Sequence, residues 1–149
     1  MLTTLEPHKL EDKNILFVGI GNVLRSDDGV GVYIAEKIQR KKNINTLIVE
    51  VSIENYIRKI NDLNPEILVL IDSVNFNKEP GYKELKPIEE IQDYIINTHN
   101  ISLKRVCEFF KMPVYILGIQ PKTIKIAEGL SPEVKQVAER IIEEINLGF

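Results

Sequence analysis

The sequence predicts a single α/β domain in which a twisted, mostly parallel sheet lies between two layers of helices. Four apolar runs rich in β-branched residues recur along the chain, as expected of strands buried on both faces, at residues 15–20, 47–51, 67–71 and 114–119. Amphipathic segments alternate with these runs, and such alternation favours parallel strands joined by helical crossovers. A glycine-rich turn follows the first run, where a strand of this fold class passes to its helix.

The first two helices are predicted from apolar residues at helical intervals. The first helix is expected over residues 28–40, on the pattern Val30, Tyr33, Ile34 and Ile38. The second is expected over residues 53–63, on the pattern Ile53, Ile57, Ile60 and Leu63. Ser52 precedes the second pattern directly and is a candidate N-cap.

Two further helices are predicted in the C-terminal third. One is indicated by Ile101, Val106, Cys107 and Phe110. The other has the cleanest apolar stripe of the chain, over residues 134–145, and it follows Ser131 and Pro132. A serine cap followed by proline at the first helical position is a typical helix start.

Residues 73–98 interrupt the alternation, and turn residues are frequent there. Residues 82–85 are a candidate for a short antiparallel edge strand. Long irregular segments in compact domains are often functional, but a surface excursion with a small hairpin fits this segment equally well.

Composition limits the class of protein. The 149 residues suit one domain, residues 1–149, with residues 1–13 as a tail or edge extension. A net charge of −3 gives no basic surface for nucleic acid. No apolar run approaches the ~20 residues of a membrane span, and the polar N-terminus does not resemble a signal peptide. We therefore expect a cytoplasmic protein without nucleic-acid or membrane partners. No helix shows a second apolar face, so a monomer is expected.

The glycine-rich turn, Gly19 to Gly31, resembles a dinucleotide-binding loop only in part. Gly19 and Gly21 follow a strand, and Glu50 ends the next strand, where a ribose-binding acid would lie. However, Leu24 stands where the third glycine belongs. Asp27 and Asp28 also occupy the mouth of the helix, where they would repel a pyrophosphate and favour a cation.

Three polar residues are predicted to meet at the carboxyl edge of the sheet. Asp28 follows the first strand, Asp72 follows the third, and His99 precedes the helix near residue 101. Two carboxylates and an imidazole are a plausible ligand set for a divalent metal. Taken singly, each residue has an ordinary structural role to weigh against this one: a first-turn acid, a turn starter and a helix cap or solvent-facing side chain.

Other reactive or charged side chains are expected to be structural. Asp27 is interpreted as the N-cap of the first helix. Cys107 is the one cysteine of the chain, which excludes an intrachain disulfide and a cysteine-rich metal site, and it is expected to be a buried core thiol. Arg25 is expected to be solvated, and His8 in the tail has no partner pattern.

Taken together, these motifs resemble those of the hydrogenase maturation endopeptidases, which trim the C-terminus of the [NiFe]-hydrogenase large subunit. The similarity covers about residues 15–145. It is carried by Gly19-Ile-Gly21-Asn22-Val-Leu-Arg-Ser-Asp27-Asp28-Gly29-Val-Gly31, by Asp72, by His99-Asn100-Ile101-Ser102-Leu103, by Gly118-Ile-Gln120-Pro121 and by Gly129-Leu130-Ser131.

The resemblance implies a function and roles for residues. Asp28, Asp72 and His99 match the family's two metal-binding acids and its histidine. In the family these side chains are taken to contact nickel already carried by the large-subunit precursor, so that cleavage follows nickel insertion; other divalent metals are expected to substitute. The same three residues are the expected catalytic residues. Two alternatives stay open at this point: a nucleotide-binding Rossmann-like protein, and a metal-binding maturation chaperone that does not cut.

Overall fold

The sheet has five strands and matches the expected fold class. The structure is a computed structural model that describes residues 12–91 and 103–148. The strands are β1 (Ile15–Ile20), β2 (Ile44–Glu50), β3 (Ile67–Ser73), β4 (Lys83–Pro87) and β5 (Val114–Ile119). Their order across the sheet is β2-β1-β3-β5-β4. All neighbouring pairs are parallel except β4 with β5, which is antiparallel.

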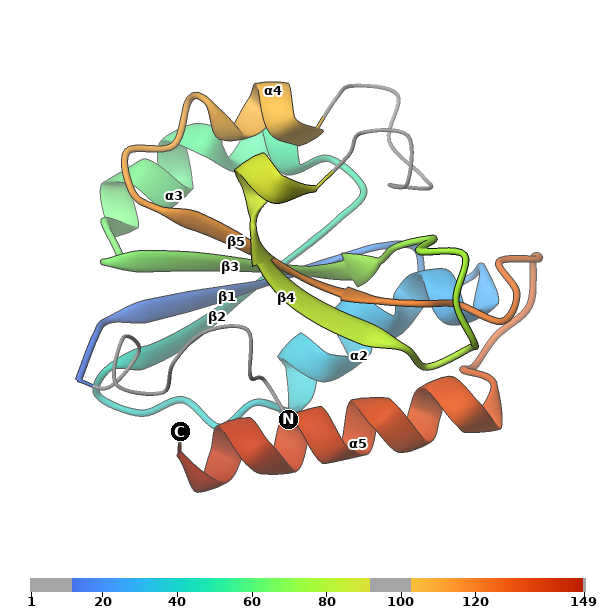
Figure 1. The fold of residues 1–149 in the computed structure, drawn as a ribbon. Helices are drawn as coiled ribbons and strands as arrows, with labels where there is room; N and C mark the ends of the chain where they lie inside the picture. The colour runs from blue at the N-terminus through green and yellow to red at the C-terminus, as the bar shows by residue number, and fades with distance from the viewer. Residues whose placement is uncertain (1–11, 92–102, 149) are drawn as a thin grey trace.

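Helices cover both faces of the sheet and complete three layers. Figure 1 shows α2 (Val30–Lys37) and α5 (Pro132–Leu147) on one face, and α3 (Ile57–Leu63) and α4 (Leu103–Cys107) on the other. Short 3-10 turns complete the described elements: η1 (Ser26–Gly29), η2 (Ile53–Tyr56) and η3 (Ile88–Glu90). Among the described residues, no helix has both the length and the apolar character needed to cross a membrane.

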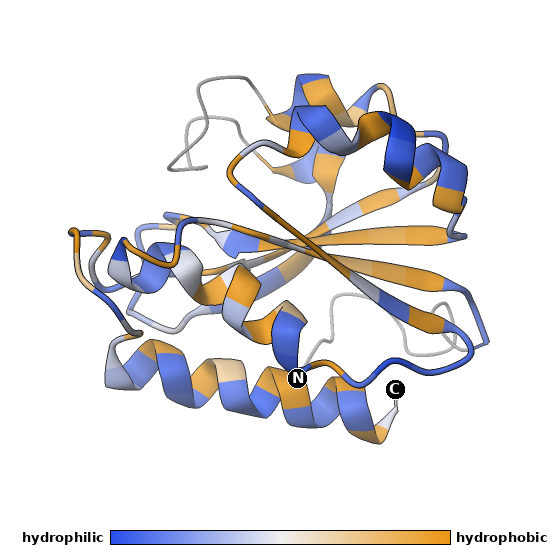
Figure 2. Ribbon diagram, turned by 180° about the vertical axis from the view of Figure 1, so that it is seen from behind, coloured by the Kyte–Doolittle hydropathy of each residue, from blue (hydrophilic) through white to orange (hydrophobic). Residues whose placement is uncertain are grey.

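Alternation along the strands explains why both faces of the sheet are covered. In β1, Ile15 and Phe17 belong to the core beneath α2 and α5, whereas Leu16 and Val18 belong to the core beneath α3 and α4. Successive side chains of a strand point to opposite faces, so a continuous apolar run requires an apolar layer on each side. Figure 2 shows the apolar central strands and the polar outer surfaces of the helices.

The predicted strands are confirmed with three differences. β3 runs two residues beyond the prediction, to Ser73, because Asp72 and Ser73 pair with β5, so Asp72 lies within the strand rather than after it. The first and last runs coincide with β1 and β5. β2 begins at Ile44, earlier than predicted, and is only partly buried because it forms an edge of the sheet. The candidate edge strand is real, but β4 runs from Lys83 to Pro87, one residue later at its start.

The two serines predicted as helix caps have the expected positions but do not form the expected hydrogen bonds. Ser52 and Ser131 both stand at N-cap positions, but neither hydroxyl caps the helix that follows it. The expected first helix also divides into η1 and α2, and α2 ends at Lys37 rather than at residue 40. The predicted tail, with His8, lies almost wholly outside the described residues, and so does the start of the helix predicted near residue 101.

The order of the strands creates a switch point between β1 and β3. From β1 the chain moves outward to β2, and it then returns to place β3 on the other side of β1. Ligands of open α/β sheets bind at such a point, outside the carboxyl ends of the strands. Asp28 follows β1 and Asp72 lies near the end of β3, so the topology brings both acids to this crevice.

Candidate active site

Glycines determine the shape of the loop between β1 and α2. Gly21 has a φ of 132°, and a Cβ at this position would lie 1.9 Å from the carbonyl oxygen of Asp28. Gly31 lies in α2, and a Cβ there would lie 2.0 Å from the carbonyl oxygen of Ile71. The first contact folds the loop back on itself, and the second allows α2 to approach the sheet closely. Together they fix where Asp28 stands.

The Asp28 carboxylate is buried, with a relative exposure of 1%. Its Oδ2 accepts a 2.9 Å hydrogen bond from the backbone nitrogen of Asn22. Its Oδ1 accepts a 3.1 Å hydrogen bond from the hydroxyl of Ser73. Both donors are neutral, and in the described part of the chain Asp28 forms no ion pair with lysine or arginine.

Asp72 and Asp28 both contact the same residue, Ser73. The Asp72 side chain is fully buried, and its Oδ1 accepts a 2.8 Å hydrogen bond from the backbone nitrogen of Ser73. Ser73 therefore contacts both carboxylates, one through its hydroxyl and one through its backbone. The structure thus brings two of the three predicted site residues together at the carboxyl edge of the sheet. His99 lies outside the described residues, so its place beside them stays a prediction.

The donor chemistry of this pair suits a divalent cation. Two buried carboxylates that contact the same neighbour place two negative charges in one crevice, and such a pair favours a cation there. Carboxylate oxygens with an imidazole nitrogen form a mixed set of the kind that nickel accepts. Within residues 12–91 and 103–148, no three histidine, cysteine or acidic side chains form a metal-binding group. A third protein ligand to a metal at this pair would therefore come from outside the described residues, and His99 is the predicted candidate.

Asp27 has a different role from the one predicted. Its carboxylate is fully buried and caps neither η1 nor α2. Instead, Oδ2 accepts hydrogen bonds from the backbone nitrogens of Lys122 (2.9 Å) and Thr123 (3.2 Å). Ser131 completes the set, donating from its backbone nitrogen to Oδ1 and from its hydroxyl to Oδ2, each at 2.7 Å. Asp27 therefore ties the loop that carries Asp28 to the segment between β5 and α5.

The same two loops are joined by their backbones. The nitrogen of Ser26 donates to the carbonyl of Ala127, and the nitrogen of Ala127 donates to the carbonyl of Leu24. Arg25 was expected to be solvated and is indeed exposed, and its Nε also donates to the carbonyl of Ile124 at 3.1 Å. Side-chain and backbone hydrogen bonds thus hold the Asp28 loop against the segment between β5 and α5, which stabilises the position of the Asp28 carboxylate.

Two residues near the site were given no role from the sequence, although Gln120 belongs to one of the motifs that carry the resemblance. Ser73 links the two carboxylates, and its place directly after Asp72 was the available signal. Gln120 is buried, and its Oε1 accepts hydrogen bonds from the backbone nitrogens of Phe76 (2.6 Å) and Lys78 (3.3 Å). It therefore holds the loop that leaves β3 just beyond Asp72.

The structure argues against a dinucleotide site in the glycine-rich turn. The backbone nitrogen of Asn22, which would face a phosphate, already donates to the Asp28 carboxylate. The close approach of helix to strand, which the third glycine of a dinucleotide loop provides, is made here by Gly31 within α2. The glycines of this turn thus present a carboxylate rather than bind a phosphate.

Cys107 is a buried core thiol, as predicted. It is 7% exposed and belongs to the core beneath α3 and α4. Burial raises its pKa to about 12, and the nearby Glu89 carboxylate adds to the shift. A thiol with such a pKa is almost wholly protonated at neutral pH and is a poor nucleophile or metal ligand. It therefore has no part in the site.

Known proteins of similar sequence indicate the family of this chain. A sequence model of the HycI family, described as hydrogenase maturation protease, matches residues 29–146. A putative hydrogenase maturation protease of Methanocaldococcus jannaschii is 29% identical, over 89% of this chain and 86% of that protein. The hydrogenase 3 maturation protease of Escherichia coli K12 is 26% identical, over 85% of each chain.

Solved structures show the same fold. The crystal structure of a [NiFe] hydrogenase maturation protease HycI from Thermococcus kodakarensis aligns with a TM-score of 0.80 and 27% identity, over 92% of this chain and 93% of that chain. The solution structure of an endopeptidase HycI from Escherichia coli aligns with a TM-score of 0.77 and 25% identity, over 89% of both chains. The family match covers most of the chain and includes all strands but the first. This chain therefore belongs to the hydrogenase maturation protease family.

Proposed function

We propose that this protein is an endopeptidase that removes the C-terminal extension from the large-subunit precursor of a [NiFe]-hydrogenase after nickel has been inserted. The observation that supports this most strongly is the pair Asp28 and Asp72, both buried and both in contact with Ser73 at the switch point of the sheet. Two acidic groups at this crevice suit the peptidase chemistry proposed here, and no lysine or arginine of the described chain forms an ion pair with Asp28.

Nickel in this proposal is part of the substrate. The precursor would present the metal with some of its own ligands, and Asp28, Asp72 and His99 would complete the coordination. Since the protein supplies only a partial set, its own affinity for a free divalent ion should be modest. Cleavage of a precursor that lacks nickel is then disfavoured, because nothing holds the extension at the site.

Two routes to peptide hydrolysis are compatible with this arrangement. A divalent ion polarises a peptide carbonyl and lowers the pKa of a bound water from ~16 towards ~7. Alternatively, one carboxylate accepts the proton of the attacking water as a general base. In both routes the buried position of the pair strengthens its electrostatic effect, because few waters screen it. Ser73 would keep the two carboxylates in a fixed relation.

Mass spectrometry of the large-subunit precursor tests the proposal. The purified protein is incubated with nickel-loaded precursor and, as a control, with precursor that lacks nickel. We expect loss of the C-terminal extension only from the loaded precursor. An unchanged C-terminus together with stable complex formation would contradict the proposal and favour a metal-binding chaperone. The monomeric state and the cytoplasmic location stay predictions from the sequence.

A further inference from the structure

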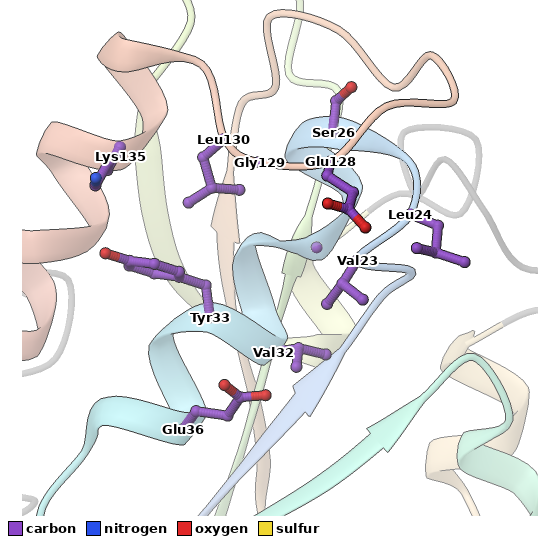
Figure 3. A pocket seen from close by; sticks show the side chains of 11 residues that line it. Val23, Leu24, Ser26, Val32, Tyr33, Glu36, Glu128, Gly129, Leu130 and Lys135 are labelled. Atoms are coloured by element: carbon purple, nitrogen blue, oxygen red, sulfur yellow. The ribbon is translucent and has the colours of Figure 1, made fainter.

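A cavity of about 410 Å³ lies next to the Asp28 loop and takes no part in the site described above. It opens between the start of α2, the loop after β1 and the loop before α5 (Figure 3). Ser26 and Gly29, on either side of the two aspartates in the sequence, both line it. Asp28 itself does not, because its carboxylate points to Asn22 and Ser73. The cavity therefore adjoins the site without being part of it.

The cavity has an apolar floor, and its charged lining residues are two glutamates and one lysine, Lys135. Val23, Val32 and Leu130 contribute apolar side chains, and Glu36 and Glu128 contribute carboxylates. Figure 3 shows the two valines between the two glutamates in that view, with Leu130 and the Tyr33 ring farther along. Neither glutamate forms an ion pair within the described part of the chain. The cavity therefore offers two carboxylates without an ion-pair partner beside an apolar surface, while Lys135 lines the cavity on the α5 side, beyond Leu130 (Figure 3).

Apolar side chains continue from the cavity onto the surface. Leu24 is 56% exposed and Val23 is 46% exposed, although both lie in a loop held by several hydrogen bonds. Ile126, in the adjoining loop, is 86% exposed. Large apolar side chains that two neighbouring, hydrogen-bonded loops present to solvent are typical of a surface that binds another protein. Val23 and Leu24 also line the cavity, and Ala127, next to Ile126, donates its backbone N–H to the carbonyl of Leu24. We name the cavity with these three exposed side chains the Leu24 surface.

We propose that the Leu24 surface binds a segment of the substrate polypeptide, away from the bond that is cut, in which an apolar side chain adjoins a lysine or arginine. The apolar side chain would enter the cavity, and the cation would face Glu36 and Glu128. This inference rests on the proposed function, since it assumes a polypeptide substrate. A polypeptide is favoured because the cavity opens along the loop that carries Asp28, so that one extended chain reaches both.

Kinetics of precursor cleavage test this surface separately from the chemistry. Glu36→Lys and Leu24→Ser each change one exposed side chain of the surface. Glu143→Lys and Leu63→Ser are matched controls, because both residues are exposed and lie outside the cavity and the site. We expect KM to rise about fivefold to tenfold in the first pair, the scale of one lost contact, with kcat unchanged. If Glu36→Lys and Leu24→Ser both keep a KM within about twofold of the wild-type value, the inference is overturned.

Crosslinking tests binding without requiring cleavage. A photoreactive benzoylphenylalanine replaces Leu24 in one variant and Leu63 in a control, and each is irradiated with nickel-loaded precursor. We expect a crosslink from position 24 alone, to a precursor segment that contains an apolar residue next to lysine or arginine. A crosslink between two copies of this chain, or none to the precursor, would overturn the inference. A crosslink of the expected kind without any cleavage would contradict the endopeptidase function and leave the docking surface supported.

Discussion

Ser131 donates two hydrogen bonds to Asp27, one from its backbone nitrogen and one from its hydroxyl, each 2.7 Å long. The two residues are far apart in the sequence, and their contact joins the loop after β1 to the start of α5. A carboxylate with two donors from one residue and two more from Lys122 and Thr123 is fully used. This contact explains why the chain carries two adjacent aspartates: Asp27 holds the loop, and Asp28 is presented by it.

Replacement of Asp27 should therefore destabilise the protein. In Asp27→Asn an amide NH2 group replaces one carboxylate oxygen. This group is itself a donor and faces the donors already present, so buried backbone N–H groups lose their acceptor. We expect the free energy of unfolding to fall by about 2–4 kcal/mol, from one or two unsatisfied charge-assisted hydrogen bonds. Urea unfolding measures this change. The exposed Asp62→Asn is the control and should change stability by less than about 0.5 kcal/mol. Equal stability of the two variants would refute this role of Asp27.

Gly31→Ala should separate α2 from the sheet. The added Cβ would lie 2.0 Å from the carbonyl oxygen of Ile71 and 2.5 Å from that of Ile20, so backbone must move. We expect a loss of more than about 3 kcal/mol, the range of severe overpacking. Thermal unfolding followed by circular dichroism measures it. Gly148→Ala is the comparison, because a Cβ at position 148 meets nothing within 4 Å. Its cost comes only from the backbone φ of 92°, and we expect it to lower the free energy of unfolding by about 1–2 kcal/mol. A smaller loss from Gly31→Ala than from Gly148→Ala would contradict the packing argument.

Tyr33 should give the protein a pH dependence at high pH. Its hydroxyl donates a 2.6 Å hydrogen bond to Glu139 on α5, and this bond, with burial and the carboxylate charge, raises the pKa of Tyr33 to about 12. The protonated form is thus favoured in the folded state. The contribution is complete below pH 10, the ordinary value, and is lost as the pH rises towards 12.

Unfolding free energies of wild type and Tyr33→Phe across this range measure the effect. The wild type should lose stability more steeply than the variant between pH 10 and 12, the unfolded and folded pKa values of Tyr33. Parallel pH profiles would show that the hydrogen bond to Glu139 does not bias the protonation of Tyr33.

The fold was predictable because its signals are local. Four apolar runs and the helical patterns between them decide the layers, since each strand of the interior must be covered on both faces. The extent of β2 was not predictable in this way, because an edge strand needs less apolar surface. The helix caps failed for a similar reason: Ser131 has the residue type of a cap, but its hydroxyl finds a stronger acceptor in the buried Asp27 carboxylate.

For the two aspartates, the sequence was enough to predict that they meet, whereas the place of His99 stays a prediction. Asp28 follows β1 and Asp72 lies at the carboxyl end of β3, and the topology makes these two strands neighbours. The division of labour between Asp27 and Asp28 was not predictable, because it depends on a loop almost a hundred residues away. The role of Ser73 also depends on a tertiary contact, because only the folded chain places its hydroxyl beside the Asp28 carboxylate.

Cleavage of nickel-loaded precursor by Asp28→Ala, Asp72→Ala and His99→Ala tests the central claim most directly. Each variant is compared with wild type for release of the C-terminal extension by mass spectrometry, and circular dichroism checks that each is folded. The account predicts that each substitution abolishes processing while the fold is kept, because each removes one group of the proposed nickel-reading site. Cleavage at the wild-type rate by a folded variant that lacks all three side chains would contradict it.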